Sequence, residues 1–293
     1  MPAPNWNAFT AVVLLVLAVL IALARASQAM LAGPREENEV ERSEDDGTAR
    51  LDNVTAESEA VAHTAEPETT RAGESETAGH ATKPGVSGHT AEPATPAVEP
   101  AEELTPGKLL LNVALSQGLF GAVLVGAAVL AAIPPAALGA ASPTLLEFGA
   151  GVALGGALFA ANELGQRGAD ALGIDYEDGL REMLTPDSPG GWLLLLGVVL
   201  PVIAGFEEFL FRAALVGALT AGYGVSPWLL VVGSTVAFAV GHGAQGTGGI
   251  LVTGALGGVL AAAFVLSGSL LVVVVAHYLV NALEFVVHAG RGT

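Results

Sequence analysis

The chain has 293 residues, of which 52% are hydrophobic and only 14% are charged, and its mean hydropathy is +0.59. This composition is typical of a membrane protein rather than a soluble domain. The formal net charge of −18 argues against nucleic-acid binding, which needs a basic surface. Because the chain contains no cysteine, disulfides, thiolate metal sites and cysteine nucleophiles are excluded.

Two segments precede the main hydrophobic part of the chain. Residues 8–24 form an apolar run that no Lys or Arg precedes and that Arg25 follows. A cleaved signal peptide usually begins with positive charge, so we interpret residues 1–26 as a transmembrane anchor that is retained. Residues 27–105 are acidic and poor in large apolar side chains, so we expect a disordered low-complexity linker.

The remaining residues, 106–293, form the predicted membrane domain. Apolar runs separated by prolines predict six helices, at about 108–133, 144–162, 191–219, 226–242, 249–267 and 269–288. The polar stretch between the second and third of these predicts a loop over 163–190. The expected fold is therefore an all-α, polytopic transmembrane bundle with a six-helix core and an extra N-terminal anchor.

The few cations predict the orientation of these helices. If the helices alternate in direction, five basic residues fall on one side of the membrane: Arg25, Lys108, Arg167, Arg181 and Arg291. The loops on the opposite side carry no Lys or Arg. The positive-inside rule then places the linker and the C-terminus in the cytoplasm, and the protein in the cell membrane with several passes.

The third of the predicted core helices carries charged residues where a membrane helix should be apolar. Glu207, Glu208 and Arg212 lie within the run from about 192 to 219. Each costs about 2.5–3.5 kcal/mol to insert at the bilayer centre, so membrane anchoring alone does not explain them. Glu208 and Arg212 are four residues apart and can pair on one helix face. Glu207 is turned about 100° away on a regular helix, which leaves it able to face a cavity.

Two of the later predicted helices carry residue pairs at the same four-residue spacing, which include the polar side chains of His242, His277 and Asn281. Phe238 and His242 form one pair, and His277 and Asn281 form the other. Counting about 1.5 Å per residue from the predicted outer ends places the polar side chains, together with Glu207, roughly 12–24 Å below one surface. Peptide hydrolysis needs a base that takes a proton from water and donors that stabilise an oxyanion. One carboxylate, two imidazoles and one carboxamide can supply both.

The three motifs in this order resemble the CPBP family, which includes the Rce1-type CAAX prenyl proteases and the bacterial Abi proteins. The resemblance covers about residues 190–290. It implies an intramembrane endopeptidase that acts on a membrane-tethered, CAAX-type substrate in the lipid bilayer. It also implies the roles of four residues: Glu207 and His242 activate water, and His277 and Asn281 form the oxyanion hole. Glu208, Arg212 and Phe238 are supporting residues, and no cofactor is required.

Three alternatives stay open from the sequence. Glu207, His242 and His277 could instead hold a catalytic zinc, although no His-Glu-x-x-His spacing is present. A proton-coupled transporter could use Glu207, His242 and Glu284 as a relay. A non-enzymatic membrane scaffold could dock partners through the linker. The sequence does not identify the substrate or the oligomeric state.

Overall fold

The computed structural model describes residues 2–32, 106–171, 183–243 and 246–289. All regular secondary structure in these ranges is helical, which confirms the predicted fold class. The predicted linker, 27–105, lies outside the described residues except for its first six positions. These continue the N-terminal helix α1 (Trp6–Ala32) beyond its predicted end. The first helix and the C-terminal helices belong to one compact unit, Met1–Leu31 with Leu104–Thr293.

Six helices of the described chain are long and apolar enough to cross a membrane. These spans are Trp6–Ala29, Pro106–Leu130, Leu145–Gly168, Pro189–Tyr223, Gly248–Ser267 and Leu270–His288. The helix predicted at 226–242 is α9 (Pro227–Gly241). It has only 15 residues and is shorter than the six spans. Pro227 begins it and His242 ends it in a non-helical conformation (φ −98°, ψ 17°). The protein is therefore a multi-pass membrane protein whose N-terminal helix is one of the six long spans.

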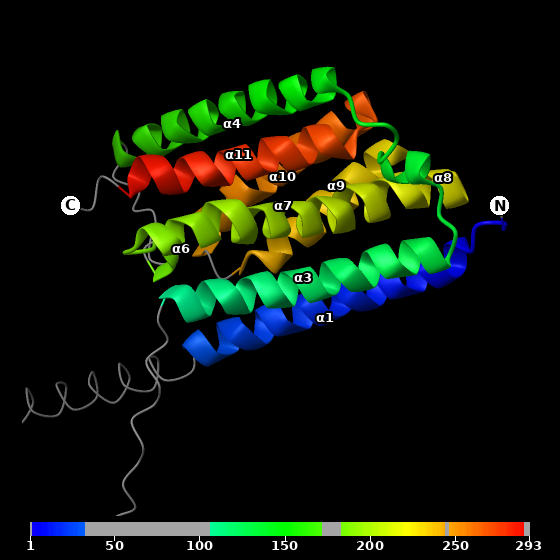
Figure 1. The fold of residues 1–293 in the computed structure, drawn as a ribbon, viewed down its shortest axis with the longest axis horizontal. Helices are drawn as coiled ribbons and strands as arrows, with labels where there is room; N and C mark the ends of the chain where they lie inside the picture. The colour runs from blue at the N-terminus through cyan, green and yellow to red at the C-terminus, as the bar shows by residue number, and fades with distance from the viewer. Residues whose placement is uncertain (1, 33–105, 172–182, 244–245, 290–293) are drawn as a thin grey trace, which may run out of the picture. The chain divides into compact units, whose positions relative to one another are not determined.

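Figure 1 shows which helices lie side by side in the bundle. Helix α4 (Leu145–Ala171) packs along α11 (Leu270–His288), and α11 packs against α7 (Leu200–Glu208). On its other side α7 contacts α3 (Pro106–Leu130), and α9 pairs with α10 (Gly246–Ser267). Helix α7 thus lies at the centre, in contact with helices from both sides.

Local sequence explains where several helices begin and end. Ser188 caps the N-terminus of α6 (Pro189–Leu194) by accepting a hydrogen bond from the Gly191 N–H. Gly224 ends α8 (Leu219–Tyr223) with φ at 67°, a left-handed conformation that glycine adopts without a Cβ clash. The prediction of a loop from residue 163 is wrong, because α4 continues to Ala171. An ion pair between Glu163 and Arg167, one turn apart, supports this extension.

Helix α1 is fixed to the other helices at its N-terminal end. The backbone N–H of Asn5 donates to the Ala131 carbonyl at 2.8 Å, and the hydroxyl of Tyr223 donates to Asn7 Oδ1 at 2.9 Å. Phe9 and Val13 are almost completely buried in the main hydrophobic core. The N-terminal span therefore packs as part of the bundle rather than as an isolated anchor.

Candidate active site

The charged motif lies where the central helical run changes its hydrogen-bonding pattern. The run from Pro189 to Tyr223 is continuous, but it contains two π-helical segments, η2 (Leu195–Val199) and η3 (Phe209–Ala218). Glu207 and Glu208 are the last residues of α7, immediately before η3 begins. π-Helical turns are rare and often occur at functional sites. Nothing in the apolar sequence of this run predicted them.

Glu208 and Arg212 form the ion pair that their spacing predicted. Arg212 Nη1 lies 3.0 Å from Glu208 Oε1, and the two side chains are 1% and 0% exposed. Arg212 Nη2 also donates to the Gly257 carbonyl of α10 at 2.9 Å, and the guanidinium lies 4.7 Å from the centre of the Phe238 ring. Such a fully buried charge pair needs these additional contacts to offset its desolvation. Arg212 thereby connects the central run to α9 and α10.

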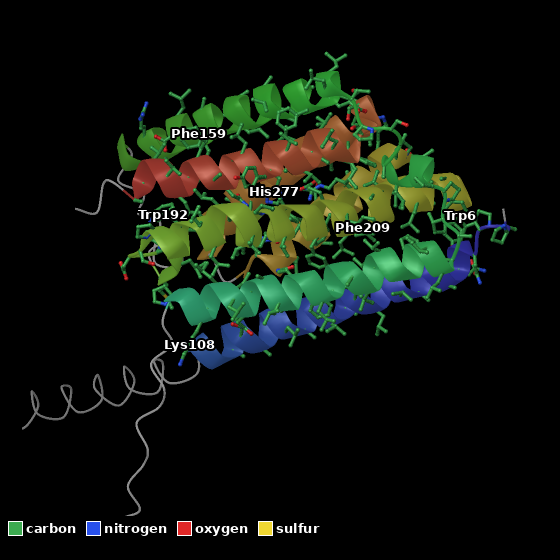
Figure 2. The ribbon with its side chains drawn as sticks, viewed as in Figure 1. Trp6, Lys108, Phe159, Trp192, Phe209 and His277 are labelled. Atoms are coloured by element: carbon green, nitrogen blue, oxygen red, sulfur yellow. The ribbon has the colours of Figure 1, made fainter. Side chains whose placement is uncertain are left out.

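Glu207 points between the two imidazoles. Its Oε1 lies 3.9 Å from His242 Nε2, and its Oε2 lies 3.7 Å from His277 Nε2. Figure 2 labels His277 on α11, in the interior of the bundle beside α7. The Glu207 side chain is 11% exposed and that of His242 is 24% exposed. The cluster is therefore mostly enclosed, and His242 is its most accessible member.

Hydrogen bonds fix the orientation of both imidazole rings. His242 Nδ1 lies 2.8 Å from the Phe238 carbonyl, which can only accept, so Nδ1 carries the proton. In the neutral ring, Nε2 then presents its lone pair toward Glu207. His277 Nδ1 lies 2.7 Å from Glu208 Oε1, which holds the ring with Nε2 toward Glu207. The Phe238 ring also packs against the His242 ring, with 4.4 Å between the ring centres and 44° between the ring planes.

The structure brings together six of the seven residues named from the sequence. Five of them join Glu207 through the contacts just described: Glu208, Arg212, Phe238, His242 and His277. Asn281 follows His277 by one turn of α11 and is half-buried. Within the described chain, the hydrogen bonds of the cluster do not include Asn281. Its predicted role therefore depends on sharing one helix face with His277.

The residues that the transporter and zinc alternatives need do not lie together as those hypotheses require. Glu284, which the transporter alternative needs in a relay with Glu207 and His242, has its carboxylate against His288 and Asn162 instead. The predicted zinc set does not converge closely. Among the described residues, Glu207, His242 and His277 do not bring one donor atom each within 4.8 Å of one another. The two imidazoles face different oxygens of Glu207, so these side chains do not fit a common metal ion as they stand.

Comparison with known proteins confirms the resemblance seen in the motifs. The buried glutamate–histidine cluster lies in a chain with six described helices that are long and apolar enough to cross a membrane. Residues 189–283 match the model of a family described as type II CAAX prenyl endopeptidase Rce1-like. This segment, about a third of the chain, holds every residue of the Glu207 cluster and supports an intramembrane CAAX-type protease in general. No curated protein matches the chain, and no solved structure matches it.

Proposed function

We propose that this protein is an intramembrane endopeptidase in which Glu207 and His242 activate a water molecule for attack on a peptide bond. The observation that carries the proposal is the position of Glu207 between the Nε2 atoms of His242 and His277. The family match to residues 189–283 supports the class of reaction.

The separation of Glu207 from His242 suits a shared water molecule. At 3.9 Å the two side chains are too far apart for a direct hydrogen bond. One water can span this distance with two hydrogen bonds of about 2.8 Å. Both groups that face the water are acceptors, because Nδ1 of His242 carries the proton of that ring. The water therefore donates both of its protons and keeps its lone pairs for a carbonyl carbon.

His277 and Asn281 are proposed to stabilise the oxyanion. For this role His277 must carry a proton on Nε2, in addition to the Nδ1 proton directed at Glu208. The ring nitrogens of His277 lie 3.7 Å from Glu207 and 2.7 Å from Glu208, so a ring protonated on both nitrogens could pair with both carboxylates. The Asn281 amide lies one turn further along the same face of α11 and can donate a second hydrogen bond.

The proposed substrate is a membrane-tethered protein or peptide, such as a prenylated CAAX-type tail. The match to the type II CAAX prenyl endopeptidase Rce1-like family supports this substrate class. The distribution of basic residues supports a cytoplasm-facing site in the cell membrane. The chemistry requires no cofactor, because Glu207 and His242 supply the base and His277 supplies the positive charge. The competing mechanism is a zinc-dependent reaction at Glu207, His242 and His277, and the experiment below distinguishes the two.

The decisive experiment is Glu207→Gln in the purified full chain. Glutamine keeps the shape of the side chain but cannot take a proton from water, so turnover should fall about 10²–10⁴-fold. The assay follows cleavage of farnesylated and unmodified membrane-anchored peptides in nanodiscs by mass spectrometry. Glu147→Gln, at the N-terminal turn of α4, is the matched control and should keep full turnover.

Two outcomes would count against the proposal. If Glu207→Gln cleaves every substrate within threefold of the parent rate, Glu207 is not the base. If exhaustive chelation removes activity, one equivalent of zinc restores it, and this zinc no longer binds to His277→Ala, the metal-dependent mechanism replaces this one. Thermal unfolding of each variant separates loss of chemistry from loss of fold.

A further inference from the structure

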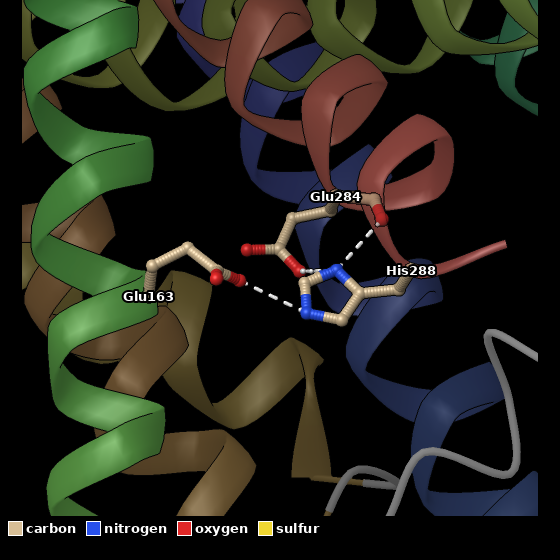
Figure 3. Close-up of side chains that lie close together, drawn as sticks. All are labelled: Glu163, Glu284 and His288. Carbon is tan, nitrogen blue, oxygen red and sulfur yellow. Dashed lines mark hydrogen bonds and ion pairs between the residues drawn. The ribbon is translucent and has the colours of Figure 1, made fainter. Parts of the chain in front are cut away.

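A second cluster of ionisable side chains lies apart from Glu207, where α4 meets the C-terminal end of α11. Glu163 comes from α4, and Glu284 and His288 come from α11 (Figure 3). One carboxylate oxygen from each glutamate and one ring nitrogen of His288 all lie within 4.8 Å of one another. In Figure 3 the two carboxylates point toward each other and toward the imidazole.

The cluster is well enclosed. The side chains of Glu163, Glu284 and His288 are 9%, 15% and 7% exposed. Carboxylates and imidazoles are the side chains that coordinate divalent cations of the zinc type. Arg167 lies 3.4 Å from Glu163 Oε2, but its side chain is 66% exposed, so solvent weakens its effect.

The orientation of His288 gives independent evidence for a ligand. Its Nδ1 lies 2.9 Å from the Glu284 carbonyl, which can only accept, so Nδ1 carries a proton. Nε2 is buried and, within the described chain, makes no hydrogen bond, although it lies 2.9 Å from Glu163 Oε1. In the neutral ring this contact sets a lone pair against a carboxylate oxygen, which is unfavourable unless a cation lies between them. An Nδ1–H bonded to a backbone carbonyl is the arrangement that presents Nε2 to a metal.

The remaining contacts are also those of a metal site. Asn162 Nδ2 donates to Glu284 Oε1 and fixes the orientation of that carboxylate. A surface pocket that includes Glu163 and Val287 reaches the cluster from outside and offers a path of entry. Donor atoms bonded to one zinc ion lie at most about 4 Å apart, since each bond is about 2.0–2.2 Å. Only a small closing movement is therefore needed.

We propose that Glu163, Glu284 and His288 bind one divalent cation of the zinc type, separate from the Glu207 site. Two carboxylates neutralise the charge of the ion, and one imidazole favours zinc over magnesium or calcium. The ion would fasten α4 to α11 seven residues beyond Asn281, and so would hold the helix that carries His277. The proposal does not depend on the proposed protease activity.

The test measures Zn²⁺ binding to the purified full chain in detergent by isothermal titration calorimetry. Co²⁺ absorption spectra report the nitrogen and oxygen ligands. We expect one Zn²⁺ per chain, at least tenfold weaker binding in His288→Gln and in Glu284→Gln, and a Zn²⁺-dependent rise in Tm in the parent that these two variants lack. Arg167→Gln, on the exposed side of Glu163, and Glu207→Gln, in the other cluster, are the matched controls and should bind like the parent.

Three results would overturn the proposal. The first is no saturable Zn²⁺ binding by the parent, which would mean that an imidazolium ion pair joins the two helices. The second is unchanged Zn²⁺ affinity in both His288→Gln and Glu284→Gln. The third is loss of binding in Glu207→Gln, which would place the ion at the other cluster. A variant that fails to fold is recognised from its circular dichroism without metal, and the remaining variant then decides.

Discussion

Arg212 offers a sharp test of how the candidate site is held together. Replacing it by methionine keeps most of the volume of the side chain but removes its charge and its donors. The change leaves Glu208, which is 0% exposed, without its 3.0 Å partner, and leaves the Gly257 carbonyl without its 2.9 Å donor. It also removes the cation that lies over the Phe238 ring. The sequence spacing predicted only the first of these contacts.

The expected loss of stability follows from these contacts. Removing one member of a buried ion pair typically costs about 3–5 kcal/mol. His277 Nδ1 still faces Glu208 at 2.7 Å in the variant, so we expect the lower end of that range from the charge. The lost hydrogen bond to Gly257 adds about 1–2 kcal/mol. Arg212→Met should therefore lower the free energy of unfolding by about 4–5 kcal/mol.

The measurement is SDS-driven unfolding of the purified chain in mixed micelles, followed by circular dichroism. Arg212→Lys keeps the charge but not the forked donors, so it should lose less than Arg212→Met. In Glu208→Gln/Arg212→Met no buried carboxylate is left at position 208, so the double variant should lose less than the sum of the two single losses. If the losses add within about 0.5 kcal/mol, the two side chains are not coupled and the reasoning is wrong.

Two further predictions concern the packing of helices around the site. Gly155→Ala would place a Cβ 2.8 Å from a backbone oxygen of α11, so it should destabilise the chain by about 1–3 kcal/mol in the same unfolding assay. The control is Gly149→Ala, because a Cβ at this position meets nothing within 4 Å. This variant should be neutral or slightly stabilising. Tyr223→Phe removes hydrogen bonds to Asn7 and Thr10, so it should weaken the docking of α1 by about 1 kcal/mol. Faster protease cleavage near the N-terminus would reveal that loss, and an unchanged rate would contradict it.

The sequence predicted well those features that depend on local spacing. The four-residue separation of Glu208 and Arg212 predicted their ion pair, and the same separation places the rings of Phe238 and His242 in contact. The apolar runs located each helix, because hydrophobicity and proline positions are local signals. The assembly of the Glu207 cluster was predictable from depth along the helices, because helical rise converts residue number into distance.

Other features depend on which helices pack against each other, and the pattern of the sequence alone does not predict these neighbours. The glycines at 151 and 155 allow α4 to approach α11 closely. Gly257 of α10 likewise lies so close to α9 that a Cβ there would be only 2.7 Å from the Phe238 ring. The second ionisable cluster was missed because Glu163 was predicted to lie in a loop and belongs to a different helix from its partners.

The shortness of α9 has a consequence for how solvent meets the candidate site. Fifteen residues rise about 22 Å, while the hydrocarbon layer is about 30 Å thick. Helix α9 is therefore shorter than the hydrocarbon layer by about 8 Å, and His242 directly follows its last residue. On the proposed function, we expect water and a hydrated peptide backbone to reach the imidazole at this end of α9 rather than through the lipid interior.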